Sequence, residues 1–175
     1  GDQYELELDI GSNSRLKVTT QSFTRIHRMN NGFASQKLDI NVGRQAVLEY
    51  LPCPVIPFAG SSYFGSTSIN LKKESVLLFG EVLSCGRYKR GEIFKYDNYS
   101  SRTKVFLDGR LIFMDNTRLT PGRQDIEGTG FYEGFTHQGT LLLFGNMMDD
   151  GVKLELHDIL KEHKGIEFGI SRTCE

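Results

Sequence analysis

The chain has 175 residues, of which 38% are apolar and 25% charged, as is usual for a globular domain with its own core. With 21 basic and 22 acidic side chains the net charge is -1, so no global positive field favours nucleic acid or an anionic membrane surface. No apolar run approaches the roughly 20 residues of a bilayer span. Three cysteines without paired spacing favour reduced thiols, so we expect a cytoplasmic protein.

The first part of the chain alternates apolar and polar residues at period two, as β-strands do. An opening strand over 4–10 is followed by strand–turn–strand units at 8–18, 38–51, 69–79 and, more weakly, 105–113. The units recur about every 30 residues, which is typical of stacked repeats. We predict a mainly β fold of stacked, solenoid-like strand–turn–strand units with one or two short helices. A meander sandwich is the competing interpretation, because hairpins also recur regularly.

The C-terminal part contains a helical pattern. Between Gly151 and Gly165, apolar residues recur at intervals of three and four, and Asp149 and Asp150 precede them at the expected N-terminus. Gly165 is a suitable left-handed stop. Residues 166–170 alternate again and predict a last strand. We expect residues 1–175 to form one β domain, and ordered elements so near both ends suggest that N- and C-terminal parts are missing.

Sequence signatures of catalysis are absent. There is no phosphate-binding loop with a following Lys-Ser or Lys-Thr, and no Gly-x-Ser-x-Gly motif. The cationic residues 87–90 suit a solvated turn, the rim of a site for an acidic protein, or a phosphate contact. Cys53 lies between two prolines, where it is either a soft metal ligand or a small buried residue.

Two carboxylates occupy unusual positions. By alternation, Glu81 shares a strand face with Leu77, Phe79 and Leu83, and Asp115 shares one with Leu111 and Phe113. A carboxylate in line with core residues is costly to bury unless it is paired or coordinates a cation. Because the two acids occupy comparable strands of successive repeats, stacking is expected to bring them together. Either they form an inward acidic pair that a divalent cation visits, or each marks a strand end or pairs with an arginine.

Three segments carry a family resemblance. Residues 19–27 resemble the region of a Thr-Lys-x-Tyr core in the urease accessory proteins called UreD or UreH. Residues 48–58 resemble that family's Leu-Glu-Trp-Leu-Pro signature, and residues 79–94 its Glu-x-x-x-x-Gly-Arg…Glu-x-Phe signature. The chain departs from the pattern at Arg25, Tyr50 and Cys53, where the family has Lys, Trp, and Gln or Phe. The matching motif positions include Leu48, Glu49, Pro52, Gly86 and Arg87.

The resemblance implies a non-enzymatic, β-helical urease maturation factor. Such a protein binds urease apoprotein and accessory protein F, and through F the GTPase accessory protein G. It implies a transient Ni²⁺ passage with no tightly bound cofactor, so we expect Glu81 and Asp115 to contact the ion. Thr24 and Glu92 are the further polar positions expected to line the passage. The alternatives are a pure protein–protein scaffold without metal contact and a carbohydrate-acting β-solenoid.

Overall fold

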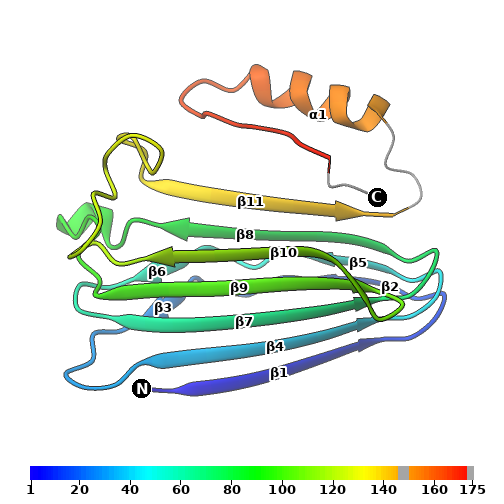
Figure 1. Cartoon of the computed structure of the whole chain (residues 1–175), viewed down its shortest axis with the longest axis horizontal. Helices are drawn as coiled ribbons and strands as arrows, with labels where there is room; N and C mark the ends of the chain where they lie inside the picture. Colours follow the sequence, from blue (N-terminus) through cyan, green and yellow to red (C-terminus); the bar gives the residue numbers. More distant parts are fainter. Residues whose placement is uncertain (146–149, 173–175) are drawn as a thin grey trace.

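The computed structural model describes residues 1–145 and 150–172. This part of the chain is built mainly from β-strands, which run along the long axis of the molecule (Figure 1). The elements are β1 (Gln3–Ile10), β2 (Arg15–Val18), β3 (Thr24–Ile26), β4 (Ala34–Val42), β5 (Val47–Tyr50), β6 (Val55–Pro57), β7 (Ser62–Leu71), β8 (Val76–Ser84), the 3-10 helix η1 (Tyr88–Arg90), β9 (Asn98–Leu107), β10 (Arg110–Leu119), β11 (His137–Phe144) and α1 (Asp150–Lys161).

The strands form two sheets, named here sheet A and sheet B, that face each other. Sheet A has the order β1-β4-β7-β9-β10, in which the first four strands are parallel and β10 is antiparallel to β9. In sheet B, β2 and β3 pair with β5 and β6, which in turn pair with β8, and β11 runs antiparallel to β8. The chain passes from one sheet to the other at each corner. The predicted stacked, solenoid-like β architecture with a short helix is therefore confirmed.

Three successive corners repeat the same local conformation. Asn13, Gln45 and Glu74 each adopt a left-handed backbone, with φ of 61°, 56° and 66°. Each corner leads from a strand of sheet A into a strand of sheet B. The stacking also aligns side chains on the outer surface, where the amide of Asn70 donates to that of Asn41, which donates to Asp9.

The unit at 105–113 differs from the other three. Asp108 and Gly109 both have positive φ, 47° and 84°, as a two-residue type I′ hairpin turn requires. Such a turn returns the chain beside the strand it has just left, so β10 pairs with β9 inside sheet A. The expectation of a fourth equivalent unit is wrong, because an Asp-Gly turn closes a hairpin rather than crossing between sheets.

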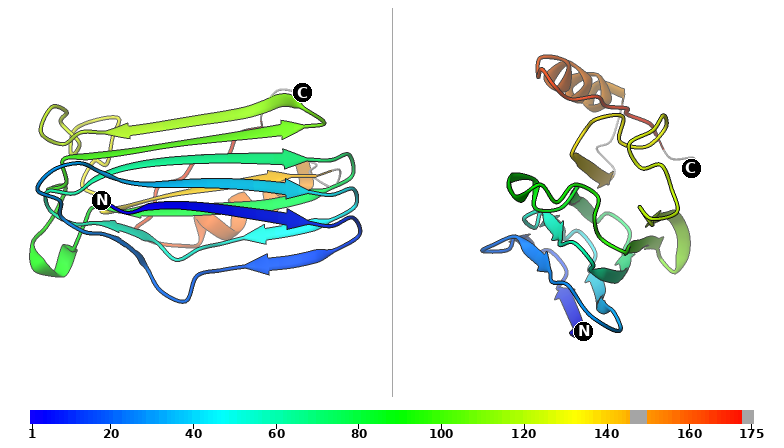
Figure 2. Two further views of the ribbon diagram at one scale, coloured as in Figure 1. Left: turned by 90° about the horizontal axis from the view of Figure 1, so that it is seen from below. Right: turned by 90° about the vertical axis from the view of Figure 1, so that its left-hand side faces the viewer.

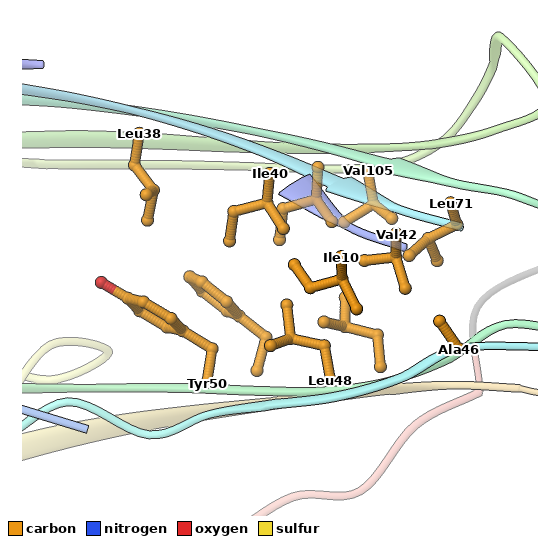
Figure 3. Close-up of a cluster of buried hydrophobic side chains, with 12 residues drawn as sticks. Ile10, Leu38, Ile40, Val42, Ala46, Leu48, Tyr50, Leu71 and Val105 are labelled. Carbon is orange, nitrogen blue, oxygen red and sulfur yellow. The ribbon is translucent and has the colours of Figure 1, made fainter. Parts of the chain in front are cut away.

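Among the described residues, the core consists of two separate apolar clusters between the sheets. The larger cluster, shown in Figure 3, fills the end of the molecule near the corners and includes Ile40, Leu48, Ile69 and Leu77. The smaller cluster lies toward the opposite strand ends and is richer in aromatic residues. The phenol of Tyr50 points away from the rest of the larger cluster (Figure 3).

The C-terminal segment lies beyond β11, on the side of the molecule away from β1 (Figures 1 and 2). The predicted helix is confirmed as α1, but it ends at Lys161, so Gly165, with a φ of 81°, lies four residues beyond the helix and is not its stop. Asp149 lies outside the described residues, as does Cys174. The strand predicted over 166–170 is wrong: these residues form no strand, and the ring of Phe168 instead contacts His157 of α1. In the described part of the chain, no helix has the length and apolar character that a bilayer span requires.

Candidate functional site

A layer of polar and small residues separates the two apolar clusters, and we call it the polar band. It crosses every strand of sheet A except β1, since each of these strands has polar or small residues between its two apolar ends. The strand register aligns them in two rows. The first row runs Gln36, Gly65, Ser101 and Thr117, and the second runs from Leu38 through Thr67 and Thr103 to Asp115.

The second row brings hydroxyl groups deep into the interior. The side chains of Thr67 and Thr103 are only 6% and 3% exposed. Thr67 lies on β7, the central strand of sheet A, and Thr103 lies on β9, where it is the register partner of Asp115 on β10. Asp115 Oδ2 accepts a hydrogen bond of 3.1 Å from Thr117 Oγ1. The row therefore offers oxygen atoms and no nitrogen or sulfur ligand.

Sheet B contributes Glu81 to the polar band. Glu81 lies on β8 between buried Phe79 and Leu83, with which it shares a face. β5 pairs with β8 as far as Phe79, and β6 pairs with it at Leu83. Beside Glu81 the chain between β5 and β6 leaves the strand conformation over residues 51–54. Glu81 thus faces the interior beside the gap between β5 and β6, where β8 has no described strand partner on that side.

The two carboxylates interact electrostatically. Burial, the larger cause, and the negative charge of Asp115 together raise the pKa of Glu81 to about 7. The Glu81 carboxylate in turn contributes to the raised pKa values of Tyr50, Tyr63 and Tyr99, for which burial is the larger cause. The polar band therefore holds one carboxyl that exchanges its proton near neutral pH, surrounded by hydroxyl groups.

The sequence pattern predicts that Glu81 and Asp115 interact, but the structure brings them together in a different way. The expectation placed them in neighbouring repeats of one stack. In the structure Asp115 belongs to the β9–β10 hairpin of sheet A and Glu81 to β8 of sheet B. The charge of Asp115 therefore acts on Glu81 from the opposite sheet, and the hairpin is what places Asp115 in sheet A.

The polar band extends to the edges of the two sheets. On one side, Thr140 of β11 pairs with Glu81 and is exposed, and Asp115 itself lies on the end strand of sheet A. On the other side, Gln36 pairs with Tyr4 of β1, whose side chain is also exposed. The band thus runs across the interior from exposed Thr140 of β11 to half-buried Gln36 of β4, beside the edge strand β1.

Of the two further polar positions, Thr24 lies nearer to the band. It is on the same face of β3 as buried Ile26, and its partner Val55 pairs with Leu83. Thr24 is therefore one row away from Glu81.

Glu92 lies in a separate network in the loops that follow β6 and β8. It forms an ion pair with Arg87, and its Oε2 also accepts from the Ala59 N–H at 3.2 Å. The hydrogen bond from Arg87 holds the pKa of Glu92 below its usual range. The guanidinium of Arg87 lies 4.0 Å from the ring centroid of Phe58. With this carboxylate occupied, the network fixes the loops against each other.

The remaining motif residues have structural surroundings. Leu48 is fully buried in the larger cluster, and Glu49 forms an exposed ion pair with Lys17 at 3.8 Å. Pro52 lies in the break between β5 and β6. Gly86 has a φ of 126°, and a Cβ atom there would lie 2.4 Å from the carbonyl oxygen of Glu92. Gly86 therefore permits the close approach of two loop segments.

Cys53 hydrogen-bonds to the neighbouring coil. Its thiol donates to the Thr20 carbonyl oxygen at 3.3 Å, and its N–H donates to Thr20 Oγ1 at 2.9 Å. Cys85 is fully buried. Among the described residues there is no group of three or more His, Cys, Asp or Glu side chains that could hold a metal ion. The structure thus provides two facing carboxylates with hydroxyl neighbours.

The sequence reasoning missed the hydroxyl groups of the band. Tyr63, Thr67, Tyr99 and Thr103 carry them from β7 and β9. The sequence does indicate them, because in both strands these residues lie on the same face as the apolar residues that follow at alternate positions. They were missed because tyrosine and threonine are common in any strand.

Comparison with known proteins agrees with the motifs. The sequence model of the family described as UreD urease accessory protein matches residues 1–175. The urease accessory protein UreD of Acetivibrio thermocellus is 38% identical over 173 residues, which is 99% of this chain and 66% of that protein. UreH of Helicobacter pylori strain P12 is 34% identical over 175 residues, 99% of this chain and 64% of that protein. The chain thus spans slightly less than two thirds of the length of these relatives, and it belongs to the UreD family of urease accessory proteins.

Proposed function

We propose that the chain acts in urease maturation by letting Ni²⁺ pass through the polar band, with Glu81 and Asp115 as the groups that contact the ion. The observation that carries this proposal is the pair of facing carboxylates in an oxygen-lined layer between two apolar clusters. Family membership supports the maturation role.

The chemistry of the band suits transport better than storage. Carboxylate and hydroxyl oxygens bind Ni²⁺ more weakly than clusters of cysteine and histidine do. A conducted ion has to bind well enough to enter and weakly enough to leave. Two carboxylates offset the charge of one divalent cation, while few strong ligands are available to trap it.

Protons compete with the metal at Glu81. Since the pKa of Glu81 is about 7, near neutral pH this carboxyl is protonated in a large fraction of molecules. Only the ionised form ligates a metal, so an arriving Ni²⁺ displaces the proton. Proton return then favours release of the ion toward the acceptor.

The role implies protein partners. We propose that the full-length protein binds urease apoprotein and accessory protein F, and through F the GTPase accessory protein G, in the cytoplasm. The chain itself acts as a scaffold and conduit in this complex and catalyses no reaction. Binding to nucleic acid or to a membrane has no part in this role, which agrees with a net charge of -1.

The test is activation of urease in a reconstituted system with the other accessory proteins and limiting Ni²⁺. Glu81→Gln and Asp115→Asn should each lower the rate of activation, and the double variant should lower it further, while binding to accessory protein F stays intact. Glu7→Gln is the matched control, because Glu7 is exposed on β1, outside the polar band. Wild-type activation by the double variant would rule out the passage and favour a pure scaffold role.

A further inference from the structure

A groove of about 680 Å³ lies at the strand ends opposite the corners. One wall is the segment over 94–98 that leads into β9, and the other is the end of β10 with the following turn at 120–123. Both walls lie at the end of sheet A where β9 begins and β10 finishes (Figure 1). The polar band and its carboxylates are not among the residues that line it.

The groove is positively charged. Lys95, Arg118 and Arg123 line it, and Asp97 is the carboxylate among the lining residues. None of the three cations forms an ion pair with another residue in the ranges 1–145 and 150–172. This concentration of positive charge contrasts with the net charge of -1 of the whole chain. A concave site with converging cations attracts an anionic ligand.

Backbone hydrogen bonds hold the first wall in place. The Gly60 N–H donates to the Lys95 carbonyl at 2.9 Å, and the Asp97 N–H donates to the Ser61 carbonyl at 2.8 Å. The amide of Asn98 donates to the Tyr63 carbonyl at 3.2 Å. These bonds tie the wall to the preceding coil.

Hydrogen bonds within the turn hold the second wall in place. The Thr120 N–H donates to Gln124 Oε1 at 2.6 Å, and the Arg123 N–H donates to the Thr120 carbonyl at 2.8 Å. A groove with both walls fixed loses little conformational entropy on binding a ligand.

The neighbouring strand indicates what kind of anion fits. β10 is the last strand of sheet A, so the backbone groups on its outer edge pair with no described strand. An extended peptide can add to such an edge through main-chain hydrogen bonds. A peptide that continues from the edge of β10 into the groove brings its side chains to Arg118 and Arg123. The guanidinium group of arginine binds carboxylates in a bidentate manner.

We propose that this groove, together with the end of β10, binds an extended acidic peptide segment of a partner protein. The segment places carboxylates at Lys95, Arg118 and Arg123 and hydrogen-bonds along β10. A small anion such as phosphate would use the same cations without the strand edge. This inference does not depend on the Ni²⁺ passage.

The test uses the purified chain and a fluorescein-labelled peptide of three glutamates alternating with valines. Fluorescence anisotropy measures its binding to the wild type, to Arg118→Gln/Arg123→Gln, and to Arg44→Gln/Arg110→Gln. The last variant removes two exposed arginines at the opposite strand ends and is the matched control. We expect the groove variant to bind about tenfold more weakly and the control to bind like the wild type. Circular dichroism verifies that all three proteins are folded.

Two further arms distinguish the ligand class. A peptide with glutamines in place of the glutamates should not bind measurably, and inorganic phosphate should displace the acidic peptide only at far higher concentrations than the unlabelled peptide. Equal losses in the groove and control variants would overturn the site. Displacement by phosphate and by peptide at similar concentrations would overturn the peptide assignment and leave a small-anion site.

Discussion

At the scale of single residues, Glu81 makes the folded state sensitive to pH. Folding raises its pKa from 4.5 to about 7, so between these pH values the folded chain holds a proton that the unfolded chain has released. The free energy of unfolding therefore falls as pH rises through this window, by about 3 kcal/mol at most. Above pH 7 this contribution is lost, and below pH 4.5 it is fully present.

Urea unfolding at pH 5 and pH 8 tests this effect. Wild type should lose stability over this interval, and Glu81→Gln should lose about 2.5 kcal/mol less, because an amide does not titrate. Comparing the two proteins cancels the contribution of all other titrating groups. Identical pH dependence in both proteins would mean that Glu81 has the same pKa in the folded and unfolded chain.

The same residue governs metal binding. The chain should bind Ni²⁺ weakly, with a dissociation constant of about micromolar or larger, since the band offers oxygen ligands alone. Affinity should drop as pH falls below 7, because Glu81 then takes up a proton. Isothermal titration at pH 6 and pH 8 measures this dependence.

Two variants sharpen the titration. Asp115→Asn should weaken the binding, and Cys53→Ser should bind Ni²⁺ like wild type, because the Cys53 thiol is engaged with the Thr20 carbonyl. A nanomolar site that is lost in Cys53→Ser would show instead that the chain stores the metal.

For the two acids, the sequence predicts the strand face of each residue but not the reason for their proximity. Strand alternation was sufficient to place Glu81 and Asp115 on faces shared with core residues. It was insufficient to explain their proximity, because that depends on which strands face each other between the sheets. The same alternation could not distinguish Glu92, whose carboxylate pairs with Arg87 only because the loops after β6 and β8 meet.

At the scale of the elements, neighbouring strands differ sharply in how much they contribute to stability. Leu38 on β4 and Leu6 on β1 are register partners, yet Leu38 is 2% exposed and Leu6 is 46% exposed. Leu38→Ala should lower the free energy of unfolding by about 3 kcal/mol, and Leu6→Ala by less than about 1 kcal/mol. Urea unfolding of the two variants measures the difference directly. Equal losses of unfolding free energy in the two variants would mean that another part of the protein covers Leu6 in solution.

The loop between β8 and β9 depends on one glycine. Gly86→Ala should cost about 2 kcal/mol or more, because its φ of 126° and the nearby Glu92 carbonyl both oppose a Cβ atom. Gly91→Ala is the control, since Gly91 also has a positive φ, 69°, but has no atom within 4 Å of the added carbon. It should cost about 1 kcal/mol. If both variants unfold at the same urea concentration, the close approach at Gly86 is not a constraint.

The sequence pattern predicts the strand–turn–strand units correctly but not the outcome of every turn. Alternation and turn residues identified the units that contain β1, β4, β5, β7 and β8. The Asp108-Gly109 dipeptide is a hairpin signal, and it outweighs the repeat spacing that predicts one more corner here. Residues 166–170 alternate like a strand and form none, since alternation describes a face and does not supply a strand to pair with.

At the scale of the whole molecule, the polar band divides the interior into two halves. Each sheet is continuous across the band on its central strands, so the halves stay joined by backbone hydrogen bonds in β7, β8 and β9. The band places polar groups in the middle of the domain, where apolar residues would stabilise the fold more, and a purely structural core has no need of them. This placement of buried hydroxyls and carboxylates is what favours a functional interpretation of the band.

Hydrogen exchange can report on the band and the groove in one experiment. Ni²⁺ bound between the facing carboxylates should slow amide exchange around Glu81 in β8 and Asp115 in β10, since the ion links the two sheets. Amides of β1 should not change, because this strand lies at the far edge of sheet A. The acidic peptide should instead protect the end of β10 and the turn at 120–123. Metal-induced protection in β1, or none around Glu81 and Asp115 at saturating Ni²⁺, would contradict the proposed passage while leaving the groove untouched.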